Sequence, residues 1–184
     1  MSSPSKRPIE RRAPSCAKSR GRVPNPVRPS LRGAPGGSAR RGLIDLSFLG
    51  KLEIAGPDAR EFLHRIASAD LSGLKPGQGA ASYVLSAQGK IQHSFEALAT
   101  PDGFLVIAEG SAVPALIQDL ETFRFGEKVG YRDFTNDLGA LLLCGPNAEA
   151  ILRAAAEGEP PPASAERSHT FLKIEGSSVL TVCD

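Results

Sequence analysis

Apolar side chains along this chain follow one pattern twice, with a spacing of 89 residues. Segments 52–66 and 141–155 each begin with a short apolar run, continue through Gly-Pro, and then place apolar residues at intervals of three and four. Such intervals put an apolar stripe along one side of a helix, whereas a short apolar run before a turn is typical of a strand. The pattern therefore predicts two copies of a strand, a tight corner and an amphipathic helix.

The first copy is expected to open with a strand over 44–54. Apolar and polar residues alternate along it, which predicts that Phe48 points to the same side as Ile54. Pro57 suits the first position of a helix, and the apolar stripe predicts that this helix ends near Ala67.

The chain that follows the first copy predicts the rest of an α+β unit. A two-residue turn at Gln88-Gly89 favours a hairpin, and continuous apolar runs are typical of buried strands. The expected elements are hairpin strands over 80–86 and 90–99, a buried strand over 104–108, a helix over 111–124 and a strand over 127–134. Their order, β-α-β-β-β-α-β, predicts a ferredoxin-like sheet with both helices on one face.

A second, similar unit starts at the second copy but is shorter. Its expected elements are a strand over 138–144, a helix over 146–156, and strands over 169–175 and 178–183. The sequence thus predicts a basic tail (1–41), a first α+β domain (42–135) and a partial second unit (136–184), with the chain truncated. Unpaired strand edges in that second unit predict that the 184 residues alone aggregate or are partly unfolded.

Charge divides the chain at the end of the tail. Residues 1–41 carry 11 Lys or Arg and one acid, whereas residues 42–184 carry a net charge of −8. The tail is rich in Pro, Ser and Gly and has no apolar period, which predicts disorder. Three interpretations stay open: a solvated extension, a transit peptide, which the prolines disfavour, and a nucleic-acid-binding arm, which the lack of aromatic residues disfavours.

Composition narrows the expected setting of the protein. The chain has no apolar run of membrane-spanning length and no signal-peptide pattern. Its three cysteines lack CxxC spacing, which suits a reducing compartment. We therefore expect a cytoplasmic protein, or a mitochondrial one if the tail is a transit peptide, with no membrane or nucleic-acid partner. The three histidines are far apart in the sequence, so no metal site is expected.

Residues with chemical potential are few, and their pattern alone indicates no reaction. His93 lies between Ile91 and Phe95 on the expected inward side of its strand, where a histidine in the core or at a pocket rim is typical. Gln92 falls on the opposite side of that strand, and Tyr83 is expected in the core with its hydroxyl at an edge. No catalytic residue is identified.

Residues 40–155 resemble a known superfamily. GPDA-x-x-FL at 56–63, LKPGQG at 74–79 and LLLCGPNAEAIL at 141–152 are similar to segments of the aminomethyltransferase (glycine-cleavage T-protein) and YgfZ-like folate-binding superfamily. The resemblance implies α+β units around a central opening that binds tetrahydrofolate. T-proteins transfer a one-carbon unit from an aminomethyl-lipoyl carrier to the folate. YgfZ-like members bind folate without that reaction and support iron–sulfur cluster assembly or repair.

Several departures from the T-protein pattern fall at its functional positions. T-proteins usually carry GGILDD after the hairpin turn, and one of its acids orients the reacting folate nitrogen. Here GKIQHS places Gln92 and His93 there, and an amide cannot supply the negative charge that stabilises a developing positive charge. VIAE replaces VVNA, so that Ala108 or Glu109 stands for the asparagine.

The resemblance therefore favours a non-catalytic, YgfZ-like protein that binds tetrahydrofolate, works with iron–sulfur assembly proteins and is a monomer at full length. Its Lys-Gly-Cys motif is expected beyond Asp184. The implied folate contacts are Tyr83, Gln92, His93, Glu109, Phe48 and Leu49. Two alternatives stay open: an aminomethyltransferase, and an interaction module that keeps the fold without a ligand.

Overall fold

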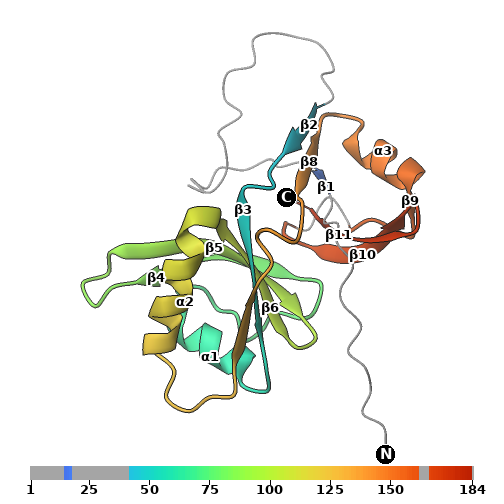
Figure 1. Ribbon diagram of the computed structural model, residues 1–184. Helices are drawn as coiled ribbons and strands as arrows, with labels where there is room; N and C mark the ends of the chain where they lie inside the picture. The colour runs from blue at the N-terminus through green and yellow to red at the C-terminus, as the bar shows by residue number, and fades with distance from the viewer. Residues whose placement is uncertain (1–14, 18–41, 162–165, 184) are drawn as a thin grey trace, which may run out of the picture.

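The computed structural model describes residues 15–17, 42–161 and 166–183 (Figure 1). The predicted disorder of residues 1–41 lies outside the described residues, apart from a short strand at 15–17. The strands are β1 (Ser15–Ala17), β2 (Gly42–Asp45), β3 (Leu49–Ala55), β4 (Gly79–Leu85), β5 (Ile91–Thr100), β6 (Gly103–Glu109), β7 (Gly130–Asp133), β8 (Leu141–Cys144), β9 (Ala156–Glu157), β10 (His169–Ile174) and β11 (Ser177–Val182). The helices are α1 (Ala59–Ile66), the 3-10 turn η1 (Gly110–Ala112), α2 (Val113–Thr122) and α3 (Ala148–Ala155).

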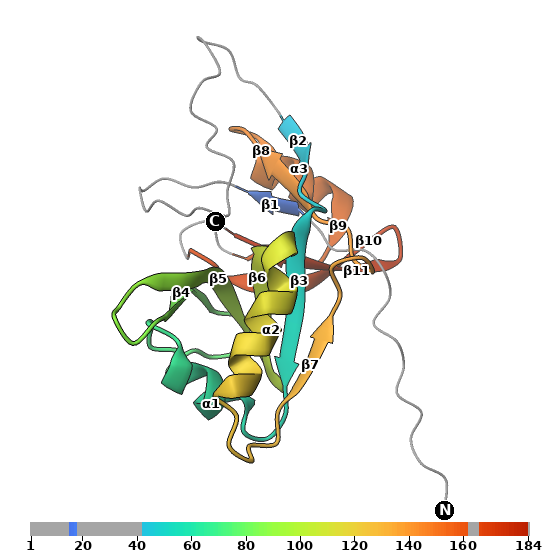
Figure 2. The same ribbon diagram turned by 60° about the vertical axis from the view of Figure 1, so that its left-hand side comes forward.

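The first unit is a five-stranded antiparallel sheet in the order β4-β5-β6-β3-β7. The order β5-β6-β3-β7 is the ferredoxin-like arrangement, and β4 extends the sheet at one edge. Both α1 and α2 lie on the same face of this sheet, as the two views show (Figures 1 and 2). The structure therefore confirms the predicted α+β class and the ferredoxin-like unit.

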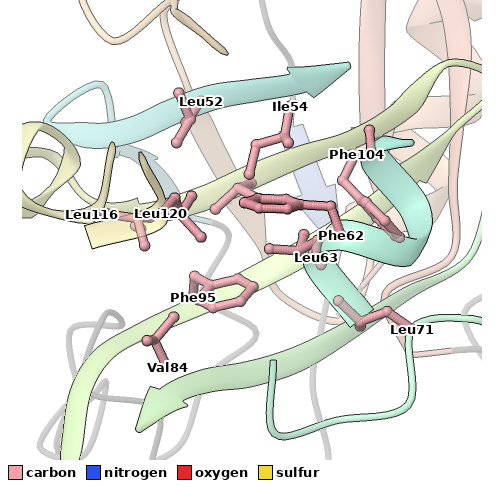
Figure 3. Close-up of a cluster of buried hydrophobic side chains, with 14 of the residues drawn as sticks. Leu52, Ile54, Phe62, Leu63, Leu71, Val84, Phe95, Phe104, Leu116 and Leu120 are labelled. Carbon is pink, nitrogen blue, oxygen red and sulfur yellow. The ribbon is translucent and has the colours of Figure 1, made fainter. Parts of the chain in front are cut away.

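A single hydrophobic core fills the space between the two helices and the sheet (Figure 3). Strand residues contribute every second side chain, because successive side chains point to opposite faces. Its largest members are Leu52, Ile54, Phe62, Leu63, Leu71, Phe95, Phe104, Leu116 and Leu120. Burying each of these side chains contributes about 1.5–3 kcal/mol, so that this core holds the first unit together.

The predicted strand over 44–54 is wrong, because the chain turns at 46–48 and divides it into β2 and β3. Asp45 accepts a hydrogen bond from the Ser47 N–H at 2.8 Å, and the Leu49 N–H donates to the Leu46 carbonyl at 3.0 Å. The hydrogen bonds from Ser47 lower the pKa of Asp45. After this turn Phe48 is 60% exposed, rather than inward like Ile54.

The predicted duplication is confirmed down to individual hydrogen bonds. The Ala59 N–H donates to the Gly56 carbonyl at 3.1 Å, and the Ala148 N–H donates to the Gly145 carbonyl at the same distance. Both helices that follow are eight residues long. The helix start at Pro57 is wrong by two residues: Gly56 has a φ of +140° and Asp58 takes the N-cap position, so Pro57 belongs to the corner.

The second unit is built from two smaller sheets. One has the order β1-β8-β2 and the other β11-β10-β9, and α3 connects β8 to β9. Strand β2 pairs with β8 in antiparallel register, from Gly42 opposite Cys144 to Asp45 opposite Leu141. The N-terminal part of the expected first domain is thus hydrogen-bonded to the second unit.

Tyr131 on β7 gives a prediction for high pH. Its hydroxyl is buried without a hydrogen-bond partner in the described part of the chain, and burial raises its pKa to about 12. A phenol ionises near pH 10 in the unfolded chain, so the unfolded state loses this proton first. Stability should therefore fall as pH rises from 10 to 12. In Tyr131→Phe, urea denaturation should show a shallower fall; an unchanged pH dependence would contradict this assignment.

Candidate functional site

The helix-free face of the five-stranded sheet gathers the polar side chains of the first unit. Strand register pairs Tyr83 with Ser94 and Leu49 with Glu109. Phe95 pairs with Ala108, so the next residues, Ser94 and Glu109, lie at the same level. These four residues therefore form one row across β4, β5, β6 and β3, on the face away from the core. We call it the polar row.

Leu49 and Glu109 close one end of the polar row, beside the turn that presents Phe48. Leu49 is buried, whereas Glu109 is exposed and its carboxylate accepts a hydrogen bond from the Ser111 hydroxyl at 2.7 Å. A Cβ at Gly110 would collide with the Phe48 carbonyl, so glycine lets the start of η1 approach this turn. The structure thus brings Phe48, Leu49 and Glu109 together.

Tyr83 and Gln92 lie near the other end of the polar row. Tyr83 is half-buried on the helix-free face, and the expectation that it belongs to the core is wrong, because Ser82 and Val84 point inward instead. The β4–β5 register slips from Val84 opposite His93 to Leu85 opposite Ile91. This bulge leaves Gln92 without an opposite residue on β4, and its side chain is exposed.

His93 lies on the helix side of β5, as predicted. Its Nε2 is 2.7 Å from the Asp119 Oδ2 of α2, and only 10% of its side chain is exposed. The hydrogen bond connects the start of β5 to the middle of α2. The structure therefore separates His93 from the polar row by the thickness of the sheet.

Glu96 and Arg167 form an ion pair on the same face of the sheet, next to the polar row; Glu96 is two residues beyond Ser94 on β5. The Arg167 Nε lies 3.8 Å from the Glu96 Oε1, and both side chains are largely buried. Arg167 has a φ of +56°, rare for a residue with a side chain, and its N–H donates to the Cys183 carbonyl at 2.7 Å. Sequence reasoning missed this pair because Arg167 lies 71 residues further along the chain.

Lys51 is the second charged residue that the sequence interpretation passed over. It is 3% exposed, and its ammonium group donates to the Ser47 carbonyl at 2.8 Å and the Thr135 carbonyl at 3.4 Å. Burial lowers its pKa, an effect that nearby Asp133 and Asp45 oppose. Ile107 pairs with both Lys51 and Glu96, which places these two residues about 10 Å apart. In the sequence Lys51 alternates with Glu53 on the polar side of the expected strand, so no local signal marked Lys51 as buried.

The face as a whole combines an apolar wall, hydroxyl groups and charges of both signs. Such a set can hold a flat, polar molecule: Leu49 and the Tyr83 ring offer apolar surface, while Ser94 and Glu109 offer hydrogen bonds. Within 15–17, 42–161 and 166–183, no three His, Cys, Asp or Glu side chains are grouped to hold a metal ion. No helix in the same ranges is both long and apolar enough to cross a membrane.

Comparison with known proteins connects this fold to aminomethyltransferases. The chain is 29% identical to an aminomethyltransferase of Rubrobacter xylanophilus over 65% of its length, and 31% identical to one of Bacillus licheniformis over 64%. It resembles the crystal structure of the glycine cleavage system aminomethyltransferase T from Bartonella henselae, with a TM-score of 0.57 and 29% identity over 64% of this chain and 32% of that one. A heterotetrameric sarcosine oxidase from Corynebacterium shares the fold (TM-score 0.57, 22% identity, 79% of this chain and 71% of that chain).

The share of each protein that these matches cover decides which conclusions they support. The chain spans about a third of the length of both curated relatives, 32% in each case. The family model described as the GCVT N-terminal domain matches residues 38–179, which include both copies of the strand-corner-helix repeat. This chain therefore belongs to the family of the GCVT N-terminal domain, within the aminomethyltransferase superfamily.

Proposed function

We propose that this chain contributes the N-terminal part of a tetrahydrofolate site in a YgfZ-like protein that carries out no aminomethyl transfer and supports iron–sulfur cluster assembly or repair. The observation that supports the non-catalytic part is the structure around 92–93. Where T-proteins carry an acid pair, this chain has an exposed amide in a bulge and an imidazole that faces α2. That stretch therefore presents no carboxylate to the helix-free face.

The polar row fits the chemistry of a folate. A pterin is a flat ring with hydrogen-bonding groups along its edge; the Tyr83 ring would stack on one face of it, Ser94 and Glu109 would bind its edge, and Leu49, which is buried, would form an apolar floor at the β3 end of the row. Phe48 and Gln92, which are exposed at the two ends of the row, would contact the rest of the ligand. His93 would act indirectly, because its hydrogen bond to Asp119 fixes the start of β5. Bound tetrahydrofolate supplies a nitrogen that can carry a one-carbon unit.

One observation favours the enzymatic alternative. Glu109 is an exposed carboxylate at the end of β6, in the row that we assign to the folate. A carboxylate there could stabilise positive charge on a folate nitrogen, in place of the missing acid pair. An aminomethyltransferase with its acid moved to Glu109 is therefore the second candidate function.

Calorimetric titration of tetrahydrofolate into the protein made from its complete reading frame tests folate binding. Tyr83→Leu removes the aromatic ring that we assign to the pterin face and should weaken binding about fivefold. Tyr131→Phe is the control, because Tyr131 belongs to the core on the other side of the sheet and should leave affinity unchanged. Absence of binding by the wild-type protein would contradict the proposal and favour the interaction module.

Turnover in a reconstituted glycine-cleavage system separates the two folate-dependent functions. The non-catalytic proposal predicts that the wild-type protein binds tetrahydrofolate and shows no turnover. Turnover that Glu109→Gln abolishes would establish the aminomethyltransferase instead. Gln92→Asp should not create turnover, because the bulge exposes residue 92 at the end of the polar row.

A further inference from the structure

The repeat extends upstream of the strand, corner and helix. Asp45-Leu46-Ser47 stands before the first copy, and Asp133-Phe134-Thr135 stands before the second. In both segments the aspartate Oδ1 accepts a hydrogen bond from the N–H two residues later, at 2.8 Å. Both turns lie where the chain passes between the two units, because 46–48 connects β2 to β3 and 134–140 connects β7 to β8 (Figure 1). Each connection between the units therefore contains the same turn.

One side chain, Lys51, joins the two connections. Its ammonium group donates to the carbonyl of Ser47 at 2.8 Å and to that of Thr135 at 3.4 Å, which are equivalent positions of the two turns. Its backbone N–H donates to the Thr135 Oγ1 at 3.2 Å. Burial lowers the pKa of Lys51, whereas Asp133 and Asp45 act in the opposite direction, so both aspartates favour its charged form. A single cation therefore serves both turns.

Ala140 occupies the position of Lys51 in the second copy, 89 residues later, and also contributes to this contact. Its N–H donates to the Ser47 Oγ at 3.1 Å, and its carbonyl accepts a hydrogen bond from the Leu46 N–H at 2.8 Å. The Lys51 side chain is shielded from water, since the residue is only 3% exposed. We call the hydrogen-bonded set of Leu46, Ser47, Lys51, Thr135 and Ala140 the connector contact.

The connector contact lies at one end of the polar row. The Ser47 carbonyl that accepts from Lys51 belongs to the peptide group that precedes Phe48. Leu49, which follows Phe48, is a member of the row. On the other side of Phe48, a Cβ at Gly110 would collide with the Phe48 carbonyl, so this peptide group is closely packed as well. A shift of the Ser47 peptide group would therefore move Phe48 and Leu49 relative to the rest of the row.

We propose that Lys51 is a positioning residue of the folate site: by joining the two connections, it fixes the turn that presents Phe48 and Leu49. This role rests on the proposed function. Lys51 is buried and would not touch the ligand, so it acts through the turn alone. Lys51→Met keeps a long, unbranched side chain and removes all three N–H donors of the ammonium group, which leaves the two carbonyls without that partner.

Hydrogen exchange without ligand, on the protein made from its complete reading frame, tests the connector contact. In Lys51→Met the amides of Leu46 and Ala140 should exchange about tenfold faster, whereas the amide of Val106 in the core should change less. Lys173→Met is the matched control, because Lys173 is exposed on β10 and should leave all three rates unchanged. Equal acceleration of the three amides in Lys51→Met, or none, would overturn the positioning role.

Ser47→Ala is a milder second variant that keeps Lys51. It removes only the hydroxyl that accepts from the Ala140 N–H, so the amides of Leu46 and Ala140 should exchange about threefold faster while that of Val106 stays unchanged. This variant decides the question even where Lys51→Met does not fold. Unchanged exchange at both connector amides in Ser47→Ala would contradict the connector contact.

Titration of tetrahydrofolate into the same protein measures the consequence for the site. Lys51→Met should weaken binding about fivefold, while Lys173→Met should leave the affinity unchanged. An unchanged affinity in a Lys51→Met protein whose connector amides exchange faster would overturn the role of Lys51 in the folate site. Absence of binding by the wild-type protein would instead overturn the proposed function and this role with it, and the exchange rates alone would then decide the connector contact.

Discussion

Leu63→Ala should lower the free energy of unfolding by about 3–4 kcal/mol, whereas Leu152→Ala should lower it by only about 1–2 kcal/mol. The two leucines occupy the same position of the repeat, one in α1 and the other in α3. Leu63 is 1% exposed inside the closed core, so its removal leaves a cavity. Leu152 is 4% exposed but already borders a small pocket, which Pro160, Thr181 and Val182 also line.

Urea denaturation followed by circular dichroism measures both changes, since the chain contains no tryptophan. The comparison is controlled by the repeat itself: the same side chain is shortened by the same atoms at equivalent positions. Equal losses for the two variants would show that the second unit has a core as complete as the first. The expected difference would instead show that the packing around α3 is less complete than the packing around α1.

The elements predicted best are those whose pattern is local. The apolar stripes of α1, α2 and α3 and the Gln88-Gly89 turn each depend on residues close in sequence, and the structure places them within a few residues of expectation. The break at 46–48 was missed because the alternation of Ile44, Leu46 and Phe48 continues through it. Local hydrogen bonds of Ser47 and Leu49 form the turn, and a distant one holds it in place: the Leu46 N–H donates to the Ala140 carbonyl at 2.8 Å.

The candidate site was predictable only where a strand carried it. Alternation along β5 correctly placed His93 on the inward side. Its hydrogen-bond partner Asp119 lies 26 residues later, and no pattern near His93 predicts that contact. The bulge at Gln92 left no sequence signal that we recognised. Lys51 and Glu96 lie on the polar sides of β3 and β5 but are buried, and Arg167 comes from the second unit. The arrangement of these three residues depends on how the two units pack against each other, and the apolar period of a single segment does not predict that packing.

Arg167→Met should lower the free energy of unfolding by about 2–3 kcal/mol near neutral pH. This loss is expected although the N–O distance of the Arg167–Glu96 pair, 3.8 Å, is longer than the distances in the ion pairs that Arg153 makes. The reason is burial: the Arg167 and Glu96 side chains are 15% and 7% exposed, so removing the guanidinium leaves a carboxylate shielded from water. Arg153→Met is the matched control. Arg153 lies 3.1 Å from Glu149 and 2.7 Å from Glu159, but all three side chains are well exposed.

Exposed pairs contribute about 0–1 kcal/mol, so Arg153→Met should be nearly neutral in the same denaturation experiment. Adding Glu96→Gln to Arg167→Met should recover part of the loss, because the buried negative charge is then gone. A loss from Arg153→Met as large as that from Arg167→Met would show that burial does not decide the strength of these pairs, and a larger loss would show that distance does. The expected result would identify the Glu96–Arg167 pair as an electrostatic contact that holds the second unit against the helix-free face. That contact lies next to the polar row that we assign to folate.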